Sequence, residues 1–159
     1  MRVSILTVSD SVAAGTYDDR SGPAVVARCK DLGWDIVSTT VLADERIAIE
    51  AFLRKTADAG DAAVDLILTT GGTGVGPRDV TPEATLAAVE RLVPGFAEHM
   101  RAEGRKSTER ALLSRGVAGI RAKTIIINLP GSPTGAVESL NAIAGLLPHT
   151  VDVVHGARH

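Results

Sequence analysis

The stretch Thr69-Thr-Gly-Gly-Thr-Gly-Val-Gly-Pro-Arg-Asp-Val-Thr-Pro-Glu-Ala84 joins an apolar segment to the beginning of a predicted helix. Four glycines, Gly71, Gly72, Gly74 and Gly76, fall within six positions. Glycine accepts positive φ angles and lets a backbone approach a ligand closely, and successive N–H groups in such a turn form a concave anion site. The stretch has neither the Gly-Lys-Ser/Thr of a P-loop nor the GxGxxG of a dinucleotide-binding turn. The glycines alone support phosphate binding and a tight strand-to-helix turn equally.

The second half of the stretch predicts where the helix begins and which polar residues stay in the loop. Thr81 suits the N-cap and Pro82 the first helical position, while Glu83 complements the helix dipole. Because Thr81 supplies the cap, Arg78 and Asp79 are left beside the glycines. They form either a mutual salt bridge or a site in which Asp79 holds Mg²⁺ and Arg78 neutralises phosphate. Mg²⁺ is usually held by one or two carboxylates together with substrate phosphates, which favours the second interpretation.

The segments on either side of this stretch predict an α/β fold. Short β-branched runs indicate buried strands, and apolar spacing near 3.6 residues indicates helices. Their alternation is typical of a parallel sheet with helices on both faces. A hairpin formed by Leu112–Arg121 and the next strand, with turns at Gly116 and Gly119, would make the sheet mixed. The predicted strands are Val3–Val8, Trp34–Val41, Val64–Thr69 and Lys123–Asn128, and the predicted helices are Gly22–Leu32, Asp44–Asp58 and an apolar stripe from Ala136 to Leu147.

Polar loops follow several of these strands, where ligand sites of parallel sheets lie. Ser9–Ser21 is predicted to be a long loop and contains Asp10. In Leu129–Pro133 the serine suits an N-cap and the second proline begins a helix, whose free N–H groups form an anion site. Taken alone, that segment favours an ordinary capped helix. Asp44 opens the second predicted helix and on local grounds is its N-cap.

Composition restricts the classes of function. The 159 residues, 45% apolar and 23% charged, predict a single globular domain spanning 1–159. A net charge of −2 argues against nucleic acid as a partner. The sequence has no basic run for a membrane surface and no apolar run of about 18 residues for a membrane span. Cys29, the one cysteine, lies on an apolar helix face, and with no signal-peptide pattern it predicts a reducing, cytoplasmic setting.

The glycine stretch, continued through Pro-Arg-Asp-Val-Thr-Pro-Glu-Ala84, resembles the signature of the molybdopterin adenylyltransferase family of molybdenum-cofactor biosynthesis, a domain that also occurs in gephyrin. Three further segments match in order: Thr7-Val-Ser-Asp-Ser11 with its continuation to Pro23, Leu113-Ser-Arg115 before Gly119-Ile-Arg, and Asn128-Leu-Pro-Gly-Ser-Pro133. The similarity runs from about Val3 to Val154. It implies a three-layer α/β/α fold, mostly parallel but mixed, and a homotrimer.

The resemblance also implies a reaction and its residues. The terminal phosphate of molybdopterin would attack the α-phosphorus of Mg-ATP, giving adenylyl-molybdopterin and pyrophosphate, and the product would pass to a downstream molybdate-insertion enzyme. Mg²⁺ would be the cofactor and ATP the co-substrate. The acidic positions that the family uses for Mg²⁺ and catalysis fall on Asp44 and Asp79. The expected binding residues are Gly71, Gly72, Thr73, Gly74 and Arg78 for phosphates, with Asp10, Ser114, Pro130, Gly131, Ser132 and Pro133 lining the same cleft.

Three other interpretations stay open. The chain could bind molybdopterin without adenylating it, act as a different nucleotide-dependent enzyme on a similar sheet, or serve as a scaffold for receptor clustering. The presence of both Asp44 and Asp79 favours catalysis over binding alone. The missing P-loop lysine argues against an ordinary P-loop kinase or ATPase, and a lone domain makes a poor scaffold.

Overall fold

Strands and helices alternate along residues 1–157, the part of the chain that the computed structural model describes; the last two residues of the predicted 1–159 domain lie outside it. The strands are β1 (Arg2–Val8), β2 (Asp35–Leu42), β3 (Leu66–Thr70), β4 (Arg91–Leu92), β5 (Ala118–Arg121) and β6 (Thr124–Leu129). The α-helices are α1 (Asp10–Ala13), α2 (Ser21–Asp31), α3 (Arg46–Ala57), α4 (Thr81–Ala88), α5 (Pro94–Gly104), α6 (Pro133–Ile143) and α7 (Leu147–Val154). Two 3₁₀ helices, η1 (Gly60–Ala62) and η2 (Glu109–Leu113), join them.

The strands form one mixed sheet in the order β2-β1-β3-β6-β5-β4. The four strands on the β2 side pair in parallel, while β5 runs antiparallel to both β6 and β4. This confirms the predicted parallel strands and the predicted hairpin. The hairpin turn is at 122–123, however, not at Gly116 and Gly119. Gly119 lies inside β5, where a Cβ would stand 2.7 Å from the carbonyl oxygen of Arg91 on the neighbouring strand.

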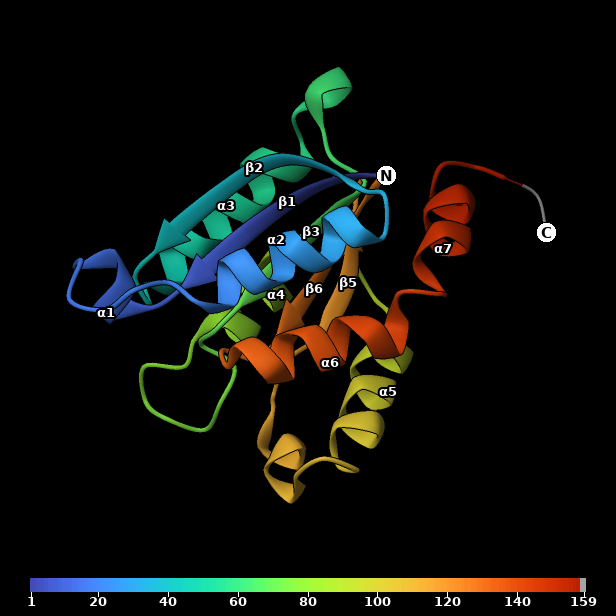
Figure 1. The fold of residues 1–159 in the computed structure, drawn as a ribbon. Helices are drawn as coiled ribbons and strands as arrows, with labels where there is room; N and C mark the ends of the chain where they lie inside the picture. Colours follow the sequence, from blue (N-terminus) through green and yellow to red (C-terminus); the bar gives the residue numbers. More distant parts are fainter. Residues whose placement is uncertain (158–159) are drawn as a thin grey trace.

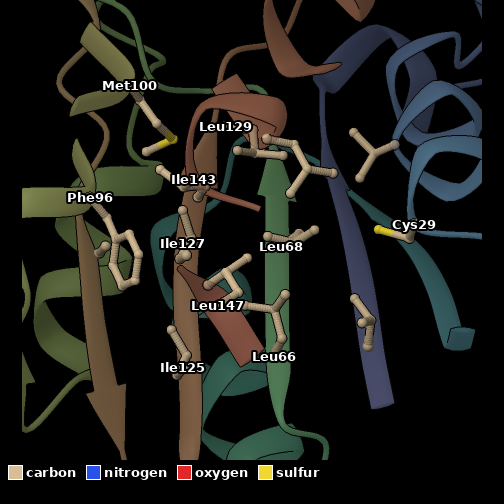
Figure 2. Close-up of a cluster of buried hydrophobic side chains, with 14 of the residues drawn as sticks. Cys29, Leu66, Leu68, Phe96, Met100, Ile125, Ile127, Leu129, Ile143 and Leu147 are labelled. Carbon is tan, nitrogen blue, oxygen red and sulfur yellow. The ribbon is translucent and has the colours of Figure 1, made fainter. Parts of the chain in front are cut away.

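Helices cover both faces of the sheet, as predicted (Figure 1). On one face, α2, α5 and α6 pack over a cluster of buried side chains that includes Leu68, Ile127 and Met100 (Figure 2). Cys29 on α2 is part of this cluster, in agreement with the sequence. On the other face, α3 and α4 pack over Leu6, Ile67 and Ile126. Strands β3 and β6 are buried along their whole length because both faces are covered, which explains why neither shows an alternation of apolar and polar residues.

A buried polar contact ties α4 to the sheet behind the site. The Asn128 side-chain amide donates to the hydroxyls of Thr69 at 3.0 Å and Thr85 at 2.9 Å, and its oxygen accepts from the Val117 N–H at 3.2 Å. Asn128 is on β6, Thr69 on β3 and Thr85 on α4. The contact therefore fixes the helix that follows the glycine loop relative to two central strands.

Three local differences from the predictions have clear causes. The predicted loop Ser9–Ser21 contains one helical turn, α1, because the Ser9 hydroxyl accepts a hydrogen bond from the Val12 N–H. No element is predicted between β4 and η2, yet α5 forms there, since Pro94 begins it and Phe96 and Met100 pack on the sheet. The predicted C-terminal stripe is divided between α6 and α7, and residues 144–146 separate them.

Candidate functional site

The site lies where the loops after β1, β2, β3 and β6 meet at the carboxyl ends of the parallel strands. The Gly71 N–H donates to the Leu129 carbonyl at 3.3 Å, which joins the loops after β3 and β6. Gly131 packs so closely there that a Cβ on it would stand 3.2 Å from the Gly71 Cα. The Thr70 hydroxyl donates to the Pro130 carbonyl at 2.7 Å and holds the same two loops together.

Two adjoining cavities open at this edge. The first, of about 430 Å³, is lined by the loop after β1, by Asp44 and by the beginning of α6. The second, of about 340 Å³, is lined by Thr73 and Gly74, by Ser114 and other residues from η2 onward, and by one face of α6. Both cavities are bordered by the same four residues: Gly72, Asp79, Gly131 and Ser132. The arrangement is a pair of pockets with a common wall that carries a carboxylate.

Asp79 folds back onto its own loop. Its Oδ2 accepts a hydrogen bond from the Gly76 N–H at 2.8 Å. A Cβ on Gly74 would stand 2.9 Å from the same oxygen, and one on Gly76 would stand 2.8 Å from it. A side chain at either position would therefore displace the Asp79 carboxylate, and the Gly76 N–H is already bonded to that carboxylate.

Asp44 comes from the loop after β2 and is not the cap of α3. The interpretation of Asp44 as a cap, made on local grounds alone, does not hold, because α3 begins at Arg46 and Glu45 precedes it without a side-chain capping bond. The Asp44 carboxylate accepts from the Asp10 N–H at 2.8 Å. Burial raises its pKa above the ordinary value of 3.8, and the charges of Asp10 and Asp79 raise it further against the hydrogen bond from the Asp10 backbone. Asp44 also stands close to the glycine loop, since a Cβ on Gly72 would lie 2.8 Å from its Oδ1.

Arg78 does not pair with Asp79, so the less favoured of the two interpretations, a mutual salt bridge, does not hold. Its guanidinium donates to both carboxylate oxygens of Asp10 at 3.0 Å and to Glu45 at 2.8 Å. Hydrogen bonding to Arg78 lowers the pKa of Asp10. Asp10 and Arg78 line neither of the two cavities; among residues 1–157 they form a bridge beside them. The bridge links the loops after β1, β2 and β3 at the rim of the site.

The helix start after β6 agrees with the sequence, whereas the start of α4 does not. Ser132 caps α6 through the Gly135 N–H at 3.2 Å, and Pro133 is its first residue. Thr81 is not the cap of α4: Val80 occupies that position, and the buried Thr81 hydroxyl donates to the Gly71 carbonyl at 3.0 Å. Gly71 turns with a φ of 103°, which points its carbonyl toward Thr81.

Sequence reasoning on single residues missed Asp19 and Arg115. The Asp19 carboxylate lies at the first cavity and accepts from the Thr7 hydroxyl at 2.7 Å and the Gly22 N–H at 2.9 Å. Arg115 holds the glycine loop from the opposite side through three backbone carbonyls. The available signal was their place inside the two matching segments from Thr7 to Pro23 and from Leu113 to Arg115.

The carboxylates of Asp44 and Asp79 suit a cation that takes some of its ligands from a substrate phosphate. Asp44 and Asp79 both line the first cavity. Within residues 1–157, no group of three or more His, Cys, Asp or Glu side chains is arranged to hold a metal alone. Mg²⁺ commonly uses one or two carboxylates and takes its other ligands from water and substrate phosphates. The crowding of negative charge that raises the pKa of Asp44 is also what a divalent cation would relieve.

The fold and the site together define a three-layer α/β protein with a two-pocket ligand site at the carboxyl edge of its parallel strands. Residues 4–149 match the family described as a probable molybdopterin binding domain. The chain belongs to this family.

Proteins that are similar in sequence to this chain include named enzymes. It is 40% identical to a molybdopterin adenylyltransferase of Helicobacter pylori, over 98% of this chain and 89% of that protein. It is 36% identical to the molybdopterin adenylyltransferase of Escherichia coli K12, over 98% and 79% of the two chains. The crystal structure of the molybdopterin biosynthesis enzyme MoaB from Thermus thermophilus is similar with a TM-score of 0.91 and 47% identity, covering 98% of this chain and 97% of that one. Across residues 1–157 no helix has the length and apolarity to cross a membrane.

Proposed function

We propose that this protein transfers the adenylyl group of Mg-ATP to molybdopterin and releases pyrophosphate. The observation that carries the proposal is the pair of adjoining cavities with Asp79 in their common wall. A transfer between two phosphorylated substrates needs two sites whose reacting ends meet, and the common wall is such a meeting point. The names of the relatives support molybdopterin as the acceptor and ATP as the adenylyl donor.

In this reaction the nucleophile belongs to a substrate. A phosphate oxygen of molybdopterin forms a bond to the α-phosphorus of ATP. The bond from that phosphorus to the bridging α–β oxygen breaks, and pyrophosphate leaves with the electron pair. The protein then supplies position and charge, as in phosphoryl transfer generally. An activated serine, cysteine or histidine is not needed.

The residues at the common wall suit these tasks. Asp44 and Asp79 would hold Mg²⁺, which would offset the negative charge of the phosphates during transfer. The backbone of Gly71, Gly72, Thr73 and Gly74 would lie against nucleotide phosphates. The beginning of α6, beside Gly131 and Ser132, carries the partial positive charge of a helix N-terminus and would take another phosphate group. Arg78 would orient Asp10 and Glu45 at the rim and add positive charge there.

The experiment measures pyrophosphate release by purified protein given molybdopterin, ATP and Mg²⁺, beside Asp79→Asn. Release that needs both substrates and the cation, and that the variant loses, supports adenylyl transfer. Tight molybdopterin binding without release would favour the alternative, a non-catalytic molybdopterin-binding module of the same pathway.

The assembly and the cellular setting extend the same proposal. By resemblance to the family, we expect a homotrimer in the cytoplasm that passes adenylyl-molybdopterin to a molybdate-insertion enzyme. Light scattering on the purified protein gives the mass directly. A mass of one or two chains at micromolar concentration would contradict the trimer without affecting the proposed reaction.

A further inference from the structure

The loop that carries Asp79 is held in place by one arginine from the segment that leads into β5. Arg115 lies between η2 and β5. Its Nε donates to the Gly74 carbonyl at 2.6 Å and its Nη2 to the Asp79 carbonyl at 2.5 Å. Its backbone N–H donates to the Thr73 carbonyl at 2.8 Å. Arg115 therefore fixes the main chain at both ends of the segment from Thr73 to Asp79.

A carboxylate holds the guanidinium in this orientation. Glu83, in the first turn of α4, forms an ion pair with Arg115 Nη1. Hydrogen bonding to Arg115 lowers the pKa of Glu83, so the carboxylate is charged at neutral pH. A guanidinium presents its donors in a rigid planar fork, so it reaches two carbonyls and a carboxylate at once. A lysine ammonium at the same place would reach only part of this set.

The loop needs such an anchor because of its composition. Gly74 and Gly76 make its backbone permissive, and the Asp79 carboxylate occupies the space that a side chain at either position would fill. The carboxylate is oriented by the Gly76 N–H, which belongs to the same permissive backbone. Unless the carbonyls of Gly74 and Asp79 are fixed from outside, this internal hydrogen bond cannot fix the carboxylate relative to the rest of the site.

We propose that Arg115, oriented by Glu83, is a positioning residue that holds Asp79 in place for adenylyl transfer. This inference rests on the proposed function for its catalytic consequence. It assigns a role to two residues outside the expected catalytic and binding set. Arg115 acts through the backbone of the loop and lines neither of the two cavities.

The test compares Arg115→Lys with a matched control, Arg121→Lys. Arg121 also pairs with a carboxylate, Asp58 at 2.6 Å, and donates to a backbone carbonyl of α4, that of Ala88 at 3.0 Å. It does so at the far end of that helix, away from both cavities. Each variant therefore replaces a guanidinium that bonds to α4 with an ammonium. Only Arg115→Lys should loosen the Asp79 loop.

Two readouts separate a positioning role from a general loss of stability. Hydrogen–deuterium exchange on the ligand-free protein follows the amides of 74–79, and steady-state kinetics separate kcat from KM. For Arg115→Lys we expect exchange in 74–79 to rise about tenfold. We expect kcat to fall about 100-fold, with the KM for ATP changing by less than about threefold, as for a reacting group displaced by about 1 Å. For Arg121→Lys we expect both quantities within about twofold of the wild type.

A second variant tests the pairing. Glu83→Gln keeps an oxygen acceptor but removes the charge, and we expect a smaller fall in kcat. Because the two side chains act as a unit, the double variant should be no slower than Arg115→Lys alone. Unchanged loop exchange in Arg115→Lys, or a loss of kcat equal to that of the Arg121 control, overturns the inference. If the wild-type protein releases no pyrophosphate, the proposed function fails separately, and exchange alone then decides whether Arg115 holds the loop.

Discussion

Asp10 and Asp44 exchange hydrogen bonds across two loops. The Asp10 N–H donates to Asp44 Oδ2 at 2.8 Å, and the Asp44 N–H donates to Asp10 Oδ1 at 3.0 Å. Each carboxylate thus fixes the backbone that carries the other. The second carboxylate oxygen of Asp44 faces the glycine loop, beside Gly72. The arrangement gathers negative charge at the first cavity and holds it there before any ligand arrives.

Asp44→Asn should stabilise the protein at neutral pH while abolishing transfer. The pKa of Asp44 is raised, so the folded state binds its proton more tightly than the unfolded state does. Stability therefore falls as pH rises from 3.8 through the folded pKa, and the penalty persists above it. The amide removes the penalty and can still accept from the Asp10 N–H. We expect Tm at pH 7 to rise by up to about 3 °C, with the difference shrinking toward pH 4. A fall in Tm at pH 7 would show that the Asp44 charge stabilises the fold.

Gly76→Ala should separate activity from stability. The new Cβ would stand 2.8 Å from Asp79 Oδ2, and only the end of that side chain has to move. The φ angle of Gly76 is not positive, so alanine adds no strain of that kind. We expect a loss in stability below about 1 kcal/mol and at least a tenfold loss in kcat.

The control for Gly76→Ala is Gly95→Ala in α5. A Cβ on Gly95 meets no heavy atom within 4 Å among the described residues. That substitution should stabilise the protein by up to about 1 kcal/mol, since alanine favours helix, and leave kcat unchanged. Equal activity in the two variants would mean that the place of the Asp79 carboxylate does not matter.

Arg78→Gln should impair the binding of ATP more than it lowers the stability of the fold. The guanidinium is exposed and its ion pairs with Asp10 and Glu45 are exposed as well, so their loss should change stability little. It also leaves two carboxylates at the rim without a cation. We expect the KM for ATP to rise about tenfold, with a smaller effect at high salt, where charge interactions are screened. A KM equal to that of the wild type at low salt would remove Arg78 from the binding machinery.

Asn128→Leu should destabilise the fold without touching a ligand. It leaves the Val117 N–H and the hydroxyls of Thr69 and Thr85 without their buried partner. A buried polar group that loses its hydrogen bond costs about 1–3 kcal/mol. We expect unfolding in urea to show a loss of at least about 2 kcal/mol. Wild-type stability would indicate that water replaces the amide.

The sequence predicts the parts of the fold whose signals are local. Strands β1, β3 and β6 are rich in apolar and β-branched residues because helices cover both faces, and Ser132 and Pro133 mark the beginning of α6. Helix α5 was not predicted, and its apolar face becomes evident only when it packs on the sheet.

The site was predicted as a set of residues but not as a set of contacts. The glycine stretch indicates the loop, and the resemblance supplies Asp44 and Asp79. The bonds between Asp10 and Asp44 depend on how β1 and β2 align, which no local pattern reveals. Arg115 contacts backbone carbonyls, so the residues that it touches carry no complementary sequence signal. The bonds from Arg78 to Asp10 and Glu45 join separate loops, so no local pattern reveals them either.

The central claim is adenylyl transfer at a site built around Asp79, and pyrophosphate release tests it most directly. Wild-type protein and Asp79→Asn are compared with molybdopterin, ATP and Mg²⁺, leaving out each component in turn. We predict release by the wild type only when all three are present, and at least a 100-fold lower rate in the variant, with Tm within about 3 °C. Release that continues without molybdopterin, or at the wild-type rate in Asp79→Asn, would contradict the account.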